Sequence, residues 1–103
     1  MINYKMYIGG EWVDAVEGET FETKNPYSGE TWATLPRARA ADADRAVAAA
    51  KAAFNSPEWS KMKPSARGQL LRRLGDLIAE NVEHLAATEV ADNGKLLAEM
   101  RGQ

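Results

Sequence analysis

Few residues in this chain have side chains that could do covalent or metal chemistry. The sequence of 103 residues contains no cysteine and one histidine, His84. Without cysteine, these residues can form no thiolate nucleophile, disulfide or thiolate metal site. His84 has no second histidine or carboxylate pattern near it, so we expect a surface or boundary histidine, not a ligand or general base. No catalytic residue is therefore predicted within this sequence.

Two features could indicate phosphate binding. Arg67, Arg72 and Arg73 could contact phosphate, and a phosphate or nucleic-acid binder would lose affinity steeply with added salt. A solvated helix face is the preferred interpretation, because the formal net charge of −2 comes from interspersed acidic and basic residues. The glycines match neither the G-x-G-x-x-G nor the Walker pattern, so they indicate turns. We expect no nucleic-acid partner.

The first forty residues carry the signals of short strands. A Gly-Gly step within Tyr7–Val13 predicts a tight hairpin, and the alternation over Thr20–Thr23 predicts a half-buried strand. Pro26 and Gly29 favour a turn over residues 25–29, since Pro26 fixes φ and Gly29 can adopt a positive φ. A further strand is expected from Glu30 to Leu35, ending at Pro36.

Helical periodicity begins near residue 41. Asp42 is placed to cap the first turn of an alanine-rich helix, which Asn55-Ser56-Pro57 should end. A loop with Trp59 follows, and Pro64 or Ser65 begins a second helix. Its broad apolar face runs from Leu70 to Leu85, with Asn81 as a predicted bend or restart. An alternative function follows from that face: a non-enzymatic helical module that binds a partner or dimerises.

An Asn-Gly pair interrupts the helical pattern close to the end of the chain. Gly94 can supply the left-handed residue that ends a helix, while Asp92 and Asn93 satisfy free backbone groups. Another helical turn is expected from Lys95 to Gln103. We expect it to leave Leu96, Leu97 and Met100 exposed.

Length and hydropathy limit the number of domains and the cellular location that can be expected. A chain of 103 residues is one domain at most, with a thin core. Its first residues do not resemble a signal peptide, and no apolar run approaches the roughly 20 residues of a membrane span. A cytoplasmic protein without a membrane partner is the expectation.

Taken in order, five stretches resemble the N-terminal region of the NAD(P)-dependent aldehyde dehydrogenase superfamily. They are Tyr7–Val13 (YIGGEWV), Thr20–Glu30 (TFETKNPYSGE), Asp42–Ala50 (DADRAVAAA), Arg67–Leu74 (RGQLLRRL) and Asp92–Lys95 (DNGK). The resemblance implies an α/β parent fold, of which residues 1–103 form the N-terminal part of the cofactor-binding domain. Strands are expected over residues 1–40 and about three helices over 41–103.

The same resemblance implies the chemistry of a longer parent enzyme. Such an enzyme oxidises an aldehyde to a carboxylate with NAD or NADP, through a thiohemiacetal on a cysteine thiolate. The family's cysteine, general-base glutamate, oxyanion asparagine and Rossmann-type segment all lie C-terminal to the region matched here. Partners implied are the aldehyde, the remaining domains and further subunits, because family members are commonly dimers or tetramers. Residues 1–103 alone are expected to be inactive.

One chemical role is implied for residues of this sequence. Many family members hold Na⁺ or K⁺ with carbonyl oxygens before the Asn-Pro and with the Asp of the Asp-Asn-Gly-Lys signature, which here correspond to Thr23, Lys24 and Asp92. Hard oxygen donors suit such a cation. Lys24 departs from the family, which often has an apolar residue there, and its ammonium could compete for Asp92. The alternative is that Asp92 serves as a helix cap or ion-pair acceptor.

Overall fold

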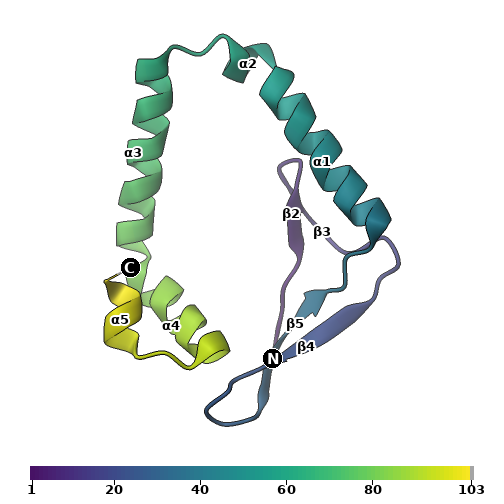
Figure 1. Ribbon diagram of the computed structural model, residues 1–103, viewed down its shortest axis with the longest axis vertical. Helices are drawn as coiled ribbons and strands as arrows, with labels where there is room; N and C mark the ends of the chain where they lie inside the picture. Colours follow the sequence, from purple (N-terminus) through teal and green to yellow (C-terminus); the bar gives the residue numbers. More distant parts are fainter. Residues whose placement is uncertain (103) are drawn as a thin grey trace. The chain divides into compact units, whose positions relative to one another are not determined.

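A computed structural model describes residues 1–102, in which five short strands precede five helices (Figure 1). The strands are β1 (Ile2–Asn3), β2 (Met6–Ile8), β3 (Glu11–Val13), β4 (Thr20–Lys24) and β5 (Thr31–Pro36). The helices are α1 (Ala40–Asn55), α2 (Pro57–Ser60), α3 (Pro64–Glu80), α4 (Val82–Asn93) and α5 (Leu97–Arg101). The chain forms two compact units. The first unit comprises residues 1–23 and 31–61, and the second comprises 24–30 and the chain from 62 onward.

The predicted Gly-Gly hairpin is present in the first unit. Strands β2 and β3 pair antiparallel, with Ile8 opposite Glu11. Gly9 and Gly10 connect them with φ of 62° and 82°. Glycine adopts this left-handed region without the penalty that a Cβ atom brings, so the local sequence determines the turn.

A second sheet has the strand order β1-β5-β4. Strand β1, which the sequence pattern did not predict, runs parallel to β5 with Ile2 opposite Ala33. Ala33 has no exposed surface. A two-residue strand is too short to show a periodicity, and its partner lies far along the chain, so the pairing has no local signal.

Helix α1 begins at Ala40, two residues before the predicted cap Asp42, and ends at Asn55 as expected. The predicted loop after it is partly wrong, because α2 places Trp59 on a short helix. Pro57 occupies the first position of α2, where a missing N–H and a fixed φ favour helix formation.

In the second unit, α3 begins at Pro64 as predicted, and Asn81 separates α3 from α4. The side-chain amide of Asn81 donates to the Leu77 carbonyl at 2.8 Å, so it competes with the helical backbone. The predicted apolar face from Leu70 to Leu85 is therefore divided between two helices. The restart at Asn81, the short α2 and the terminal α5 account for five helices in residues 1–102 where about three were expected.

Helix α5 packs against α4. The prediction that Met100 is exposed is wrong: only 5% of its surface is accessible, whereas Leu96 and Leu97 are exposed as expected. Arg101 forms an ion pair with Glu83 at 2.7 Å on the exposed side of the same pair of helices. Burial of Met100 therefore contributes apolar stabilisation to this helix pair.

Few side chains are buried within residues 1–102. The buried residues are Ala15, Ala33, Asp42, Ala86 and Met100. Large apolar side chains are exposed along α3, where Leu71 has 69% of its surface accessible. In the described part of the chain, no helix has the length and apolarity needed to cross a membrane.

Candidate functional site

The residues proposed to bind a cation lie at the ends of two elements. Thr23 and Lys24 are the last residues of β4, and Asp92 lies in the last turn of α4. Lys24 and Asp92 belong to the second unit, whereas Thr23 belongs to the first. The structure thus brings two of the three predicted residues into one compact unit.

A direct contact joins the segments that carry Lys24 and Asp92. Two residues beyond Lys24, Pro26 lies so close to Gly94 that a Cβ atom on Gly94 would stand 2.9 Å from Pro26 Cγ. Gly94 is the left-handed residue at the end of α4, with φ of 73°, and its N–H donates to the Val90 carbonyl at 2.9 Å. The predicted helix end at Gly94 is confirmed, and it is also a packing site.

Asn93 holds the chain as it leaves α4. Its Oδ1 accepts the Lys95 N–H at 2.8 Å, and its Nδ2 lies 4.0 Å from the Met100 sulfur of α5. The sequence pattern predicted that Asn93 would satisfy backbone groups here. Asp92 directly precedes Asn93, in the last turn of α4.

The turn after Lys24 is closed by hydrogen bonds. The Asn25 N–H donates to the Glu30 carbonyl at 2.9 Å, and the Gly29 N–H donates to the Asn25 carbonyl at 2.8 Å. The Asn25 side chain accepts the Tyr27 N–H at 2.9 Å. The turn predicted over residues 25–29 is thus confirmed, and it fixes the direction in which the chain leaves β4.

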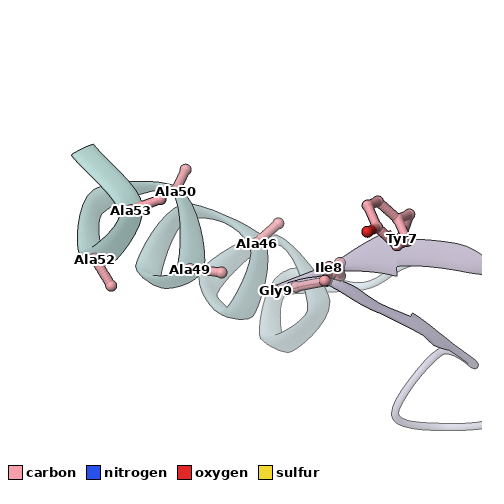
Figure 2. A pocket seen from close by; sticks show the side chains of 9 residues that line it. Tyr7, Ile8, Gly9, Ala46, Ala49, Ala50, Ala52 and Ala53 are labelled. Atoms are coloured by element: carbon pink, nitrogen blue, oxygen red, sulfur yellow. The ribbon is translucent and has the colours of Figure 1, made fainter. Parts of the chain in front are cut away.

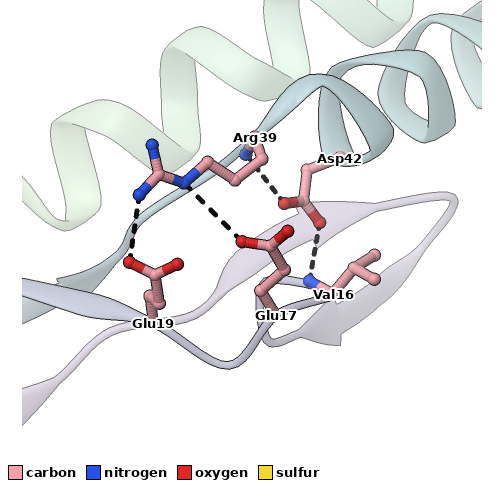
Figure 3. Close-up of polar contacts among 5 residues, drawn as sticks. All are labelled: Val16, Glu17, Glu19, Arg39 and Asp42. Atoms are coloured by element: carbon pink, nitrogen blue, oxygen red, sulfur yellow. Dashed lines mark hydrogen bonds and ion pairs between the residues drawn. The ribbon is translucent and has the colours of Figure 1, made fainter.

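Asp42 is the buried carboxylate of the first unit (Figure 3). Its Oδ2 accepts the Arg39 N–H and its Oδ1 accepts the Val16 N–H, both at 2.9 Å. Arg45 adds a contact to Oδ1 at 3.1 Å and donates to the Asp14 carbonyl at the same distance. Hydrogen bonds from Arg39 and then Val16 lower the pKa of Asp42 below its ordinary value of 3.8.

The Asp42 cluster has a structural role that the sequence showed only in part. The capping role at the start of α1 was predicted. The bond to Val16 was missed because no local pattern relates two residues so far apart in the chain. Together the contacts fasten the connection after β3 to the first turn of α1.

The remaining polar residues singled out in the sequence do not converge on a site. Arg73 pairs with Glu80 at 3.5 Å, both side chains being 60% exposed. The His84 carbonyl accepts the Thr88 hydroxyl, as in an ordinary helix. Among residues 1–102, no group of three or more His, Cys, Asp or Glu side chains could hold a metal ion. A cation that is bound mainly by backbone carbonyl oxygens does not require such a group of side chains.

Two grooves are large enough to raise the question of a dinucleotide. One, of about 580 Å³, lies between the β2–β3 turn and the alanines of α1, where a Cβ atom on Gly9 would stand 3.8 Å from Ala49 Cβ (Figure 2). The other, of about 560 Å³, is lined by residues of α3, α4 and α5, including Leu85, Glu89 and Met100. Neither groove has a basic side chain among its lining residues.

Comparison with known proteins decides the family. A sequence profile of the aldehyde dehydrogenase family matches residues 12–103. The chain belongs to the aldehyde dehydrogenase family. A putative aldehyde dehydrogenase of Bacillus subtilis, DhaS, is 47% identical over 95 residues, which are 92% of this chain and 19% of DhaS. The mitochondrial 10-formyltetrahydrofolate dehydrogenase of Mus musculus is 50% identical over 93 residues, 90% of this chain and 10% of that protein.

Solved aldehyde dehydrogenases have the same fold over this region. A mutant enzyme from Bacillus cereus superimposes with a TM-score of 0.94 at 42% identity, covering 98% of this chain and 21% of its own. A betaine aldehyde dehydrogenase mutant from Staphylococcus aureus, solved in complex with NAD⁺, gives 0.90 at 40% identity over 95% and 20%. The expected mixed α/β fold is confirmed. This aldehyde dehydrogenase chain spans about a fifth of those two structures.

Proposed function

We propose that this chain is the N-terminal segment of an aldehyde dehydrogenase that oxidises an aldehyde to a carboxylate with NAD⁺ or NADP⁺. One observation carries the proposal: 98% of the chain superimposes on 21% of a solved aldehyde dehydrogenase, with a TM-score of 0.94. Catalysis would use a cysteine of the remaining sequence, which forms a thiohemiacetal with the aldehyde. The 103 residues contain no cysteine. This segment would therefore act by positioning, not by contact with the reacting atoms.

The nicotinamide cofactor, when bound to the parent enzyme, would accept the hydride. Because the family's Rossmann-type segment lies C-terminal to the region matched here, we assign the cofactor's binding site to the remaining sequence of the parent. The contribution of this segment is to hold the connection after β3 and the start of α1 in fixed positions through the Asp42 hydrogen bonds. In this proposal, the segment forms part of the cofactor-binding domain.

The apolar face of α3 is exposed, which supports the inference that another part of the parent enzyme covers it. Leu70, Leu71 and Leu74 have 52%, 69% and 53% of their surfaces accessible. A contiguous apolar surface of this kind is stabilised when another surface covers it. We assign the face to packing against the remaining domains of a cytoplasmic, dimeric or tetrameric enzyme. This assignment replaces the alternative of an independent interaction module.

We further propose a Na⁺ or K⁺ site formed by the carbonyl oxygens of Thr23 and Lys24 and the carboxylate of Asp92. The contact between Pro26 and Gly94 supports it, because it holds the turn after Lys24 against the end of α4. Two hard carbonyl donors and one carboxylate suit a weakly bound monovalent cation. The site would stabilise the junction of strand end and helix end, without entering the reaction.

The decisive experiment compares the protein encoded by the complete reading frame with the isolated 103-residue chain. We expect the complete protein to form NADH or NADPH from a set of aliphatic and aromatic aldehydes. We expect the isolated chain to form none. Reduction of either cofactor by the isolated chain would overturn the proposal, and so would a complete protein that lacks a cysteine.

A further inference from the structure

Asn93 differs chemically from every other asparagine of this chain. The residues that follow the five asparagines are Tyr4, Pro26, Ser56, Val82 and Gly94. Glycine has no side chain, so the backbone nitrogen of Gly94 has unhindered access to the Asn93 side-chain amide. Asn93 is therefore the asparagine most suited to spontaneous deamidation.

The reaction needs no reagent except water. The Gly94 nitrogen loses its proton to solvent base and attacks Asn93 Cγ, the new C–N bond closes a succinimide ring, and the amide nitrogen leaves as ammonia. Water then opens the ring at either carbonyl, which gives aspartate or isoaspartate. The net change replaces NH₂ by OH, a mass increase of about 1 Da, and adds one negative charge.

The structure engages the groups that would have to react. The Gly94 N–H, which must be deprotonated, donates to the Val90 carbonyl at 2.9 Å. The Asn93 Oδ1 accepts the Lys95 N–H at 2.8 Å, which directs the side chain toward Lys95. Both contacts must break before Cγ can reach the Gly94 nitrogen. The end of α4 therefore protects Asn93 for as long as it remains closed.

Solvent access and packing determine how often this end opens. Asn93 and Gly94 are exposed, so base and water can reach them once the hydrogen bonds are broken. Met100 of α5 is buried and lies 4.0 Å from the Asn93 amide nitrogen, and Pro26 lies against Gly94. These two contacts hold the α4 terminus closed.

We propose that Asn93 is a modification site: it deamidates spontaneously at a rate set by opening of the α4 C-terminus. Either product alters the site beside it. Aspartate places a second carboxylate next to Asp92. Isoaspartate lengthens the backbone by one methylene, so that Gly94 can no longer keep both its bond to Val90 and its position against Pro26. Modification would thus loosen the contact between the turn after β4 and the end of α4.

The test follows deamidation of Asn93 in the protein encoded by the complete reading frame by peptide mass spectrometry, in native buffer and in denaturing urea. Asn55 is an internal control, since it also ends a helix but precedes serine. In urea we expect Asn93 to convert faster than Asn55. In native buffer we expect conversion of Asn93 to be at least about tenfold slower than in urea. Equal native and denatured rates at Asn93, or faster conversion of Asn55 in urea, would overturn the proposal.

A pair of variants tests what keeps the terminus closed. Met100→Ala removes the buried contact of α5, and we expect it to raise the native rate at Asn93 toward the rate in urea. Met6→Ala makes the same chemical change in β2 of the first unit and should leave the Asn93 rate unchanged. An unchanged rate in Met100→Ala would show that this packing does not control the reaction.

Discussion

Gly94 and Pro26 are in such close contact that no side chain fits between them: a Cβ atom on Gly94 would stand 2.9 Å from Pro26 Cγ. Gly94 also has a positive φ of 73°. Two independent requirements, conformation and space, therefore select glycine at the end of α4. Gly94→Ala tests the two requirements together, and a double-mutant cycle with Pro26→Ala separates them.

Gly94→Ala should destabilise the protein by about 1–3 kcal/mol, because alanine is strained at positive φ and its methyl group would collide with Pro26. Gly68→Ala is the matched control in the same unit. Gly68 lies within α3. Apart from its chain neighbours and the backbone of its own helix, no atom stands within 4 Å of the place that an alanine methyl group would take, so alanine there should stabilise by about 0.5–1 kcal/mol. Urea unfolding followed by helical circular dichroism measures both.

A double-mutant cycle isolates the steric clash between an alanine methyl group at position 94 and Pro26. In a Pro26→Ala background the extra atoms that Gly94→Ala meets are gone, so part of its destabilisation should be recovered. The conformational part should remain. If Gly94→Ala costs the same in both backgrounds, the contact with Pro26 contributes nothing to the choice of glycine.

Asp42→Asn should expose two specific backbone amides to exchange. The carboxylate accepts the N–H groups of Val16 and Arg39, and an asparagine offers only one acceptor oxygen. We expect hydrogen-exchange protection of at least one of these amides to fall by about tenfold or more. Asp44→Asn makes the same change at an exposed position of α1 and should alter neither amide.

The contribution of the Asp42 hydrogen bonds to stability should be lost in acid. The folded-state pKa of Asp42 is lowered from 3.8, so its contribution is complete above that value and is lost as pH falls through the lower folded value. The stability difference between the wild type and Asp42→Asn should therefore be constant at neutral pH and shrink below about pH 4. The pKa of Glu19 is also lowered, mainly by Arg39, but Glu19 titrates in both proteins. A difference that grows in acid would contradict this assignment.

Packing, not the ion pair, should hold α5 on α4. Met100→Ala removes a side chain that is 5% exposed and should cost about 2–5 kcal/mol. Glu83→Gln removes the charge partner of Arg101; these two side chains are 69% and 47% exposed, so the loss should be less than about 1 kcal/mol. Urea unfolding of the two variants should show the larger loss for Met100→Ala, and the reverse order would refute the argument.

The proposed cation site predicts a dependence on the ion supplied. In the complete enzyme, replacing choline by Na⁺ or K⁺ should raise the melting temperature, and Asp92→Asn should abolish the rise. Asp76→Asn, which changes an exposed carboxylate of α3, is the control and should retain it. An Asp92→Asn enzyme that responds to the cations as the wild type does would exclude Asp92 as a ligand.

Features with a local backbone cause were predictable from the sequence. The Gly9-Gly10 turn, the helix start at Pro64, the interruption at Asn81 and the end at Gly94 all follow from conformational preferences of single residues. For the candidate site, the helix end beside Asp92 was predicted on these grounds. The ligand role of Thr23, Lys24 and Asp92 rests on family resemblance and remains a prediction.

Features that depend on distant partners were not predictable. Strand β1 exists because Ile2 and its neighbour pair with β5, and Met100 is buried because α5 folds back on α4. The bond between Asp42 and Val16 is of the same kind. In each case the local pattern was compatible with several outcomes, and a contact with another element selected one.

The turn of residues 24–30 belongs to the second unit, although the strands on either side of it belong almost entirely to the first. During synthesis, the tip of the β4–β5 hairpin leaves the ribosome long before the residues of α4 that Pro26 contacts. The second unit can therefore be completed only after Gly94 has been made, and closing that long loop carries an entropic cost. No single cut separates the two units: a cut after residue 61 leaves this tip with the first unit, and a cut after residue 23 leaves residues 31–61 with the second.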